Sequence, residues 1–330
     1  MERALIEPQP HLNTATVRVV AVVVTHDRPS LLWRCLDAIG AQSRQPDSVI
    51  VLDNGSGRAT RSVIERFAFA AHVRLPINLG GAFGFRAGIS AALANDFDFI
   101  WTMDDDGMAA DGMCLERLIQ SAVRTQADVA GPLIIDIENP NRLAFPLRRG
   151  GKMLHRVDDV SADGPLLGFA HLFNGTLIRA ELFRAIGLPN PTLMMRGDEV
   201  EFLYRARRHG ARIILDQQAH FQHPGSSAEL KPMLLGKYYA VLPLNQLKRR
   251  YTFRNRGYIF ARYGLWLHLA ADALRYAWFF LVTRRGDVMG LREWCRLTLA
   301  GVRLRHTLDL PELDLPPVEA KTSVAAALAR

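Results

Sequence analysis

Residues 99–107 read Phe-Ile-Trp-Thr-Met-Asp-Asp-Asp-Gly, an apolar run typical of a buried strand that leads directly into three carboxylates. Like charges this close raise one another's pKa unless a metal ion or a basic partner offsets them. Because side chains alternate along a strand, we expect Asp104 and Asp106 on one face and Asp105 on the other. Two carboxylates on one face are typical of a Mg²⁺ or Mn²⁺ site on a nucleotide substrate. The alternative is an acidic surface turn, since Asp before Gly is common in turns.

Strands and helices alternate around this stretch. Strands are expected at 17–24, 49–52 and 73–77, and helices at 30–39 (with Ser30 as the N-cap), 60–69 and 86–94. This alternation predicts a parallel sheet with helices on both faces, whose ligands bind at the carboxyl ends of the strands. Asp53, Asn78 and the acidic triplet follow three of these strands, so we expect them to meet in one crevice.

The glycines after the third strand raise a dinucleotide-binding hypothesis. Gly80, Gly81 and Gly84 precede a predicted helix, as in a phosphate-binding loop. A dinucleotide fold, however, carries its glycine loop after the first strand, and the turn at 25–28 contains no glycine. The sequence therefore disfavours an oxidoreductase.

Composition limits the class of protein. The chain has 330 residues, of which 49% are hydrophobic, so it can form one large domain with an appendage. Its net charge of +8 indicates an anionic partner: nucleic acid, anionic lipid or a phosphorylated substrate. The three cysteines are widely separated and form no metal or disulfide pattern, which favours a reducing compartment. No stretch reaches the roughly 18 apolar residues of a spanning helix, and residues 1–16 lack the apolar core of a secretory signal. We expect a cytoplasmic protein that touches a membrane without crossing it.

The second half of the chain contains another acidic cluster. Asp198 and Glu199 begin a helix predicted to end at His209, and acids in a first turn also stabilise a helix for purely structural reasons. A strand at 212–215 is expected to lead into a loop with His220 and His223. Single loop histidines are more often surface residues than ligands.

Other segments of this half are basic, aromatic or turn-like. Residues 142–150 form a basic segment that fits a hairpin or an acceptor-facing loop, and 173–178 fit a turn entering a strand. From residue 237 the chain is rich in arginine and aromatic residues, and a mostly apolar helix is predicted at 265–282. Trp266, Trp278 and Trp294 fit anchors of an interfacial helix pair on an anionic membrane; the alternative is a helical hairpin whose apolar face packs on the predicted α/β domain. No RNA-binding motif accompanies these residues, so nucleic acid is not an expected partner.

Several motifs together resemble a known family. Residues 22–29 (VVVTHDRP), 51–56 (VLDNGS), 78–81 (NLGG) and the acidic triplet occur in the order found in glycosyltransferase family 2, which has the GT-A fold. More specifically, the chain resembles galactofuranosyltransferases that initiate arabinogalactan in actinobacterial cell walls. The segments that carry this resemblance are 142–150 (RLAFPLRRG), 196–201 (RGDEVE), 252–258 (TFRNRGY) and 278–285 (WFFLVTRR).

The resemblance implies an α/β fold of the GT-A type, with a Rossmann-like, mainly parallel mixed sheet, flanking helices and a C-terminal helical, membrane-associating region. The expected divisions are a flexible leader (1–16), a catalytic domain (17–236) with a nucleotide-sugar half (17–107) and an acceptor half (108–236), a basic aromatic helical region (237–306) and a disordered tail (307–330).

The resemblance also implies a reaction. The enzyme would move galactofuranose, with inversion, from UDP-galactofuranose to polyprenyl-diphosphate-linked GlcNAc-rhamnose at the inner face of the plasma membrane. Inversion by one direct displacement needs a base for the acceptor hydroxyl and an electrophile for the departing diphosphate, here Mn²⁺ or Mg²⁺. A homo-oligomer is compatible with the sequence.

Site residues follow from the same resemblance. The metal would be held by Asp104, Asp106 and His223. The donor would be held by Thr25, Arg28, Asp53, Asn54, Asn78, Gly80, Gly81, Asp104 and Asp105. Alignment on the following residues 200–202 makes Glu199 the first candidate for the base. Family members often have Asp where this chain has Glu199, so Asp198 stays open as the second candidate. The acceptor would lie near Trp101, Asn174, Gly175 and Arg196.

Two other functions remain open at this point. One is a rhamnosyltransferase that uses dTDP-rhamnose in cell-surface polysaccharide synthesis, since the general motifs do not specify the sugar. The other is a non-catalytic, membrane-bound scaffold of glycan assembly. A scaffold predicts an eroded metal or base site, whereas both acidic clusters are intact here.

Overall fold

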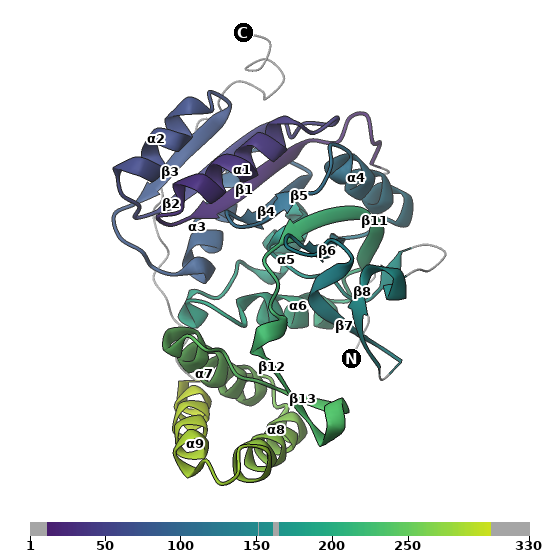
Figure 1. Ribbon diagram of the computed structural model, residues 1–330. Coiled ribbons are helices and arrows are strands. Elements are labelled where there is room, and N and C mark those ends of the chain that lie inside the picture. The colour runs from purple at the N-terminus through teal and green to yellow at the C-terminus, as the bar shows by residue number, and fades with distance from the viewer. Residues whose placement is uncertain (1–11, 151, 161–164, 305–330) are drawn as a thin grey trace.

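The computed structural model describes residues 12–150, 152–160 and 165–304. The expected disordered tail at 307–330 and most of the expected leader lie outside the described residues. The described residues form two parts, one above the other. A sheet covered by helices on both faces forms the upper body, and three long C-terminal helices lie beneath it (Figure 1).

The sheet is mixed, as expected. Among the described residues it contains eleven strands, with the central order β3-β2-β1-β4-β10-β6-β11-β5. Their bounds are β1 (Val19–Thr25), β2 (Ser48–Asn54), β3 (Ala70–Leu75), β4 (Phe99–Asp104), β5 (Met108–Ala109), β6 (Val129–Asp136), β7 (Arg142–Arg149), β8 (Lys152–Arg156), β9 (Leu166–Leu167), β10 (Asn174–Arg179) and β11 (Ile213–His223). Strands β3, β2, β1 and β4 are parallel, whereas β10 is inserted antiparallel between β4 and β6.

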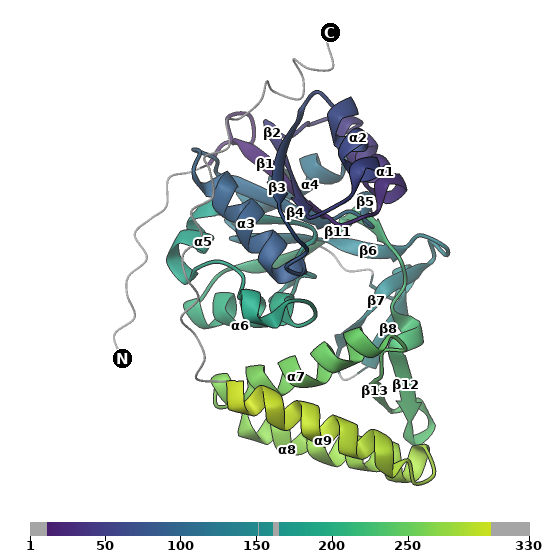
Figure 2. The same cartoon turned by 90° about the vertical axis from the view of Figure 1, so that its left-hand side faces the viewer.

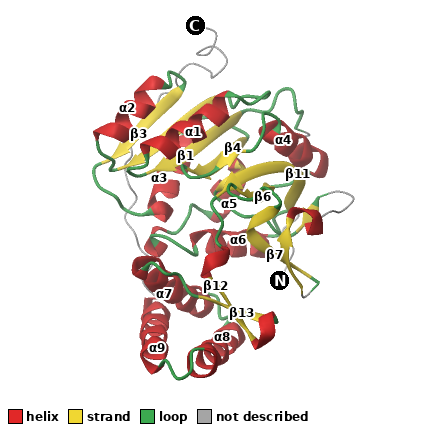
Figure 3. Cartoon of the chain, in the orientation of Figure 1, coloured by secondary structure: helices red, strands yellow, loops and turns green. Residues whose placement is uncertain are grey.

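Helices cover both faces of this sheet (Figure 3). They are α1 (Pro29–Gly40), α2 (Arg58–Arg66), α3 (Gly81–Leu93), α4 (Cys114–Thr125), α5 (Ala180–Ile186) and α6 (Asp198–His209). The prediction that Ser30 caps the first helix is wrong. The helix begins at Pro29, whose fixed φ suits the first helical position, and Arg28 precedes it without a side-chain cap.

The central strand β1 explains why the sheet is covered on both sides. All seven of its residues are buried. Val19, Ala21 and Val23 pack into one apolar cluster, and the alternating residues pack into a second cluster on the other face. A strand buried on both faces needs a continuous apolar run, which is what the sequence shows.

The glycines of α3 serve close packing of that helix on the sheet. A Cβ at Gly84 would lie 2.6 Å from a methyl group of Val24, and one at Gly88 would lie 2.6 Å from a methyl group of Val22. These positions therefore have no room for a larger side chain. This packing role gives the glycines a reason other than a dinucleotide-binding loop, and the helix starts at Gly81, earlier than predicted.

Strand β11 corrects the prediction for the two histidines. The strand was expected to end near Leu215, but it continues through an irregularity between Asp216 and His220 and ends at His223. His220 and His223 therefore belong to a strand and not to a loop. Being three residues apart, they point to opposite faces of the sheet.

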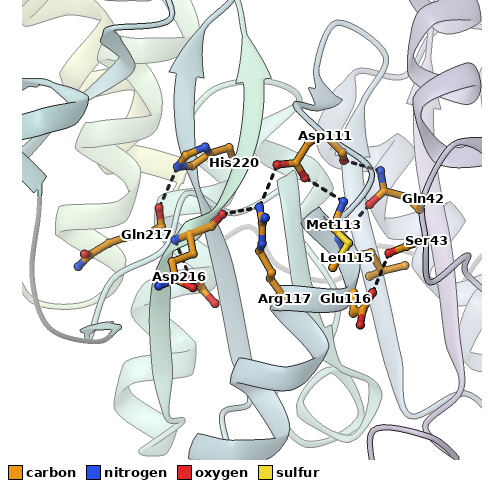
Figure 4. A network of polar contacts seen from close by, with 11 residues as sticks. Gln42, Ser43, Asp111, Met113, Leu115, Glu116, Arg117, Asp216, Gln217 and His220 are labelled. Carbon is orange, nitrogen blue, oxygen red and sulfur yellow. Dashed lines mark hydrogen bonds and ion pairs between the residues drawn. The ribbon is translucent and has the colours of Figure 1, made fainter.

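A polar network holds the start of α4 against β11 and the end of α1 (Figure 4). Arg117 pairs with Asp111 at 2.9 Å and donates to the Gln218 carbonyl at 2.9 Å. The side chain of Gln42 accepts from the backbone of α4, and His220 lies in the same region with its Nε2 2.9 Å from the Gln217 carbonyl. His220 therefore contacts the backbone of its own strand in this network.

The C-terminal region forms a separate helical layer below α6 (Figure 2). It consists of the hairpin β12 (Leu230–Met233) and β13 (Tyr238–Val241), helix α7 (Gln246–Arg262), helix α8 (Trp266–Trp278), the π-helix η5 (Phe279–Thr283) and helix α9 (Val288–Arg303). The layer has its own apolar cluster, in which Trp294 stacks on Tyr276 at 5.2 Å. The prediction that Trp294 anchors the protein in a membrane is therefore wrong, because its side chain is buried. Within the described ranges, none of the helices has the length and apolarity needed to cross a membrane.

Candidate active site

The acidic triplet after β4 lies beside the end of β1. Thr25 donates to Asp105 at 2.7 Å, and Arg28 donates to Asp105 at 3.1 Å and to Asp106 at 2.8 Å. The triplet thus has a basic partner that is distant in sequence, and Arg28 brings the ends of two parallel strands together. Asp105 is buried, whereas Asp104 and Asp106 are only partly buried. The expected alternation does not extend through the triplet, because β4 ends at Asp104 and one nitrogen of Arg28 contacts both Asp105 and Asp106.

His223 reaches the same place from the end of β11. Its Nε2 lies 3.2 Å from Oδ1 of Asp106, while its Nδ1 lies 2.8 Å from the Pro224 carbonyl. If Nδ1 carries the hydrogen that this carbonyl accepts, Nε2 presents a lone pair to a carboxylate oxygen. Two facing acceptor atoms require a proton or a cation between them.

The pKa values of Asp104 and Asp106 are shifted in opposite directions. Burial raises the pKa of Asp104 well above its usual value, and the neighbouring carboxylates Asp106 and Asp105 raise it further. Burial also acts to raise the pKa of Asp106, but His223 and Arg28 outweigh it and lower that pKa below the ordinary value. A cation near Asp104 would remove the like-charge repulsion that destabilises its ionised form.

The donor set fits a divalent ion in its chemistry. Carboxylate oxygens and an imidazole nitrogen are suitable ligands for Mn²⁺, and Asp106 and His223 are adjacent in this structure. Across the described ranges, however, no three His, Cys, Asp or Glu side chains are already arranged as a group that could hold a metal ion. Phosphate oxygens and water would therefore have to supply other positions, as is usual for Mg²⁺ and Mn²⁺ with nucleotides.

The turns after β2 and β3 meet beside the triplet, but several of their polar groups hold the backbone. Asp53 is buried and accepts from the Ser56 amide at 2.6 Å and from His72 at 3.2 Å. Asn54 accepts from the Leu79 amide and donates to the Gly80 carbonyl, both at 2.9 Å. The amide of Asn54 therefore fixes the glycine turn.

The glycine turn approaches the second acidic cluster. Asn78 accepts from the Gly80 amide at 2.8 Å. Gly80 has φ of 89°, and a Cβ there would collide with the carbonyl of Met194, so the position requires glycine. At Gly81, in contrast, a Cβ would meet nothing within 4 Å, which leaves space beside the backbone for a ligand.

The second acidic cluster, Asp198 and Glu199, begins α6. Burial and the charge of Glu199 raise the pKa of Asp198 well above its usual value. The Glu199 charge also contributes to the raised pKa of Asp104, so the two clusters lie within electrostatic reach. Glu199 itself accepts from the Gly197 amide at 2.9 Å.

The loop before α6 has an unusual backbone. Met194, Arg196 and Gly197 have φ of 58°, 64° and 95°. A left-handed conformation costs a residue with a side chain about 1–3 kcal/mol, so such a loop persists only when its surroundings hold it. Asn255 of α7 provides this support, because its amide nitrogen lies 2.6–2.9 Å from the carbonyls of Leu193, Met195 and Arg196.

The expected acceptor residues lie in different environments. Trp101 is fully buried and its indole donates to the Gly175 carbonyl at 2.9 Å. In this structure its side chain therefore packs in the core. Asn174 donates to the Leu172 carbonyl at 2.9 Å. Arg196 forms an ion pair with Glu229 at 2.7 Å.

The ring of Phe145, from the segment 142–150, packs beside His223 and His171. The ring of Phe145 lies 4.8 Å from the ring of His223 and 5.1 Å from that of His171. Nε2 of His171 is buried without a hydrogen-bond partner, and burial together with His223 lowers the pKa of His171 to about 3. Nothing in the pattern around His171 marked it, since its neighbours approach it only through tertiary packing.

The parallel strand ends, the acidic triplet and the second acidic cluster define a sugar-nucleotide transferase architecture of the GT-A type. The family model of glycosyl transferase family 2 matches residues 20–186. The chain belongs to this family. It is similar to the galactofuranosyltransferase GlfT1 of Mycobacterium tuberculosis, with 42% identity over 294 residues that cover 87% of this chain and 96% of the relative. It is equally similar to GlfT1 of Mycolicibacterium smegmatis, with 42% identity over 299 residues that cover 88% and 99%.

Solved structures with low identity share the fold. Residues 1–349 of Staphylococcus aureus TarS, crystallised with UDP-GlcNAc, give a TM-score of 0.55 at 13% identity, covering 88% of this chain and 85% of that one. GalNAc-T7 with UDP, GalNAc and Mn²⁺ gives a TM-score of 0.52 at 14% identity, covering 74% and 48%. These likenesses confirm the predicted GT-A architecture.

Proposed function

We propose that the protein transfers galactofuranose from UDP-galactofuranose to polyprenyl-diphosphate-linked GlcNAc-rhamnose and so begins the galactan of cell-wall arabinogalactan. The observation that carries this proposal is the 42% identity, over 96% of the relative, between this family 2 glycosyltransferase and enzymes named galactofuranosyltransferase. The electrostatic influence of Glu199 on Asp104 supports it. The segments RLAFPLRRG and TFRNRGY, which suggested this activity, form a hairpin strand and part of α7.

Glu199 is the proposed base. Its carboxylate accepts a hydrogen bond from the Gly197 amide and is less buried than that of Asp198. Its charge also contributes to the raised pKa of Asp104. Asp198 has a raised pKa and is better suited to remain protonated. Glu199 would accept the proton of the acceptor hydroxyl while the sugar leaves the diphosphate, in one inverting displacement without a covalent intermediate.

The diphosphate is proposed to bind at the triplet. Asp104, Asp106 and His223 would hold Mn²⁺ or Mg²⁺, which supplies positive charge to the departing diphosphate when bound. Arg28 orients Asp106 and Asp105 through its guanidinium. Thr25, Asp53 and the turn at 78–81 would surround the nucleotide, and the open side of Gly81 supports this placement.

In place of the expected boundary at 236/237, the catalytic domain is proposed to end before β12, near residue 229, because β12 pairs with β13 and Met233 packs into the apolar cluster of the helical region. The helical region carries large apolar side chains on its exterior, as a surface on the cytoplasmic face of a membrane would require. Exposed members include Trp266, Leu267, Leu274, Trp278, Leu281, Val282 and Met289. Arg284, Arg285 and Arg292 are exposed on the same region and suit an anionic lipid surface.

A radiolabel transfer assay tests the activity. Purified protein is incubated with a lipid-diphosphate GlcNAc-rhamnose acceptor, Mn²⁺ or Mg²⁺, and either UDP-galactofuranose or dTDP-rhamnose. Product formed only from UDP-galactofuranose, and lost with EDTA, is the expected result. Product formed only from dTDP-rhamnose would replace the proposal with the rhamnosyltransferase, and no product from either donor would favour the scaffold.

A further inference from the structure

Asn255 connects the C-terminal helices to the candidate base through a single peptide unit. Its amide nitrogen donates to the carbonyl of Arg196 at 2.6 Å. The amide on the other side of the same Arg196–Gly197 peptide bond donates to Glu199 at 2.9 Å. Since a peptide unit is planar, fixing its carbonyl also fixes the direction of its N–H.

The orientation of the Asn255 amide is determined by its surroundings. Three carbonyl oxygens, those of Leu193, Met195 and Arg196, lie on the nitrogen side. The side-chain oxygen accepts from Nε of Arg254 at 2.8 Å. The opposite orientation would place the amide oxygen against three carbonyls, and Asn255 is buried, so water cannot take over these contacts.

Neighbouring residues of α7 hold the same loop. Arg254 donates to the Thr192 carbonyl at 2.6 Å, and Asn190 donates to the hydroxyl of Tyr258 at 3.0 Å. A Cβ at Gly197 would lie 3.4 Å from Cβ of Asn255, so the loop is in direct contact with the helix. The left-handed backbone at Arg196 and Gly197 therefore depends on α7 for its support.

We propose that Asn255 is a positioning residue for catalysis, which holds the Arg196–Gly197 peptide so that its N–H orients the Glu199 carboxylate toward the acceptor hydroxyl. This inference rests on the proposed role of Glu199 as the base. Loss of the Asn255 amide frees that peptide to rotate, and Glu199 then loses the hydrogen bond that fixes its position. Misplacement of a catalytic group by about 1 Å can cost about a hundredfold in rate.

The test compares Asn255→Ala and Asn255→Asp with a matched control on the same helix. Asn245 caps α7 by accepting from the Lys248 amide at 3.0 Å and has no contact with the 193–197 loop among the described hydrogen bonds. Asn245→Ala therefore weakens the helix without releasing the loop. Transfer kinetics, melting temperature and amide hydrogen exchange of residues 194–199 are measured for all variants.

Both Asn255 variants are expected to lose at least about tenfold in kcat with donor KM within about twofold of the parent. Amide hydrogen exchange at residues 194–199 should become faster in the Asn255 variants but not in Asn245→Ala. Each variant is measured at a temperature the same number of degrees below its own melting temperature. A kcat within about twofold of the parent, or the same loss in Asn245→Ala, would overturn the inference.

The exchange measurement separates this inference from the proposed function. If the parent transfers only rhamnose, the galactofuranosyl assignment fails and the kcat comparison is made with dTDP-rhamnose. If the parent transfers neither sugar, exchange decides alone. Faster exchange confined to the Asn255 variants then supports the hold on the loop, and unchanged exchange refutes it.

Discussion

At the scale of single residues, Glu199 and Asp198 are adjacent but differ in environment. Glu199→Gln keeps the size of the side chain and removes its basicity. We expect transfer to fall by about 10²–10⁴-fold, which is the usual contribution of a general base, with little change in melting temperature because Glu199 is only partly buried. The measurement is kcat at saturating donor, and circular dichroism monitors folding. A variant with near-parental kcat would assign the base elsewhere, with Asp198 as the next candidate.

Asp198 should instead affect how the stability of the folded protein depends on pH. Its pKa is raised in the folded protein by burial and Glu199, so from about pH 4 upward the folded state retains a proton that the unfolded state has lost. This group therefore destabilises the fold increasingly as pH rises toward its folded pKa. Asp198→Asn should melt higher than the parent at pH 7–8, and the difference should shrink toward pH 4.

Thermal melts between pH 4 and 8 check this expectation, with the exposed Asp158→Asn as the control. A difference between Asp198→Asn and the parent that stays constant across the range would contradict it.

The triplet could be singled out from the sequence because three consecutive acids after an apolar run repel one another unless a cation or a basic partner offsets them. Their partners could not. Arg28 reaches the triplet because β1 and β4 are adjacent in the sheet, and the ring of Phe145 packs against both His171 and His223. The structural use of Asn54 was equally hidden, since an asparagine after a strand fits a ligand site or a turn.

At the scale of elements, helix α3 shows how glycine can be required inside a helix. Alanine normally stabilises a helix by about 1 kcal/mol relative to glycine. At Gly84 the new methyl group would press on Val24 of β1, so Gly84→Ala should destabilise the protein by about 1–3 kcal/mol. Gly81→Ala, at the open start of the same helix, should leave stability unchanged or raised.

Urea unfolding of both variants checks these signs. A Gly84→Ala variant as stable as the parent would show that α3 can move away from the sheet without cost.

Element boundaries were predicted best where a strand is buried on both faces. The run at 17–24 corresponds closely to β1. The extension of β11 to His223 was missed because its second half, from Gln217 onward, is polar and lacks the apolar run of a buried strand. That half nevertheless pairs in parallel with β6, and tertiary pairing of this kind overrides local propensity.

At the scale of the whole molecule, the helical region presents an apolar exterior. Leu267 and Leu274 are 85% and 75% exposed on α8. The double variant Leu267→Glu/Leu274→Glu should bind anionic phospholipid vesicles at least about fivefold more weakly, because it loses apolar contact and adds like charge. Sedimentation with vesicles measures this, and Leu167→Glu, which changes an exposed leucine on β9, is the matched control.

If the double variant and the control bind vesicles equally well, the apolar side chains of α8 do not contact the lipid surface.

The hold of Asn255 on the 193–197 loop also has a consequence for the timing of activity during synthesis. The chain emerges from the ribosome with its amino end first, so the strands that end at Thr25 and Asp104 are made long before α7. Until α7 has been translated and folded, the Arg196–Gly197 peptide lacks its hydrogen bond to the side chain of Asn255. A nascent chain would then carry the nucleotide-binding side of the site while Glu199 is not yet held in place. It would neither transfer the sugar to an acceptor nor hydrolyse the donor. On the proposed role of Asn255, catalytic competence would begin only once α7 has folded.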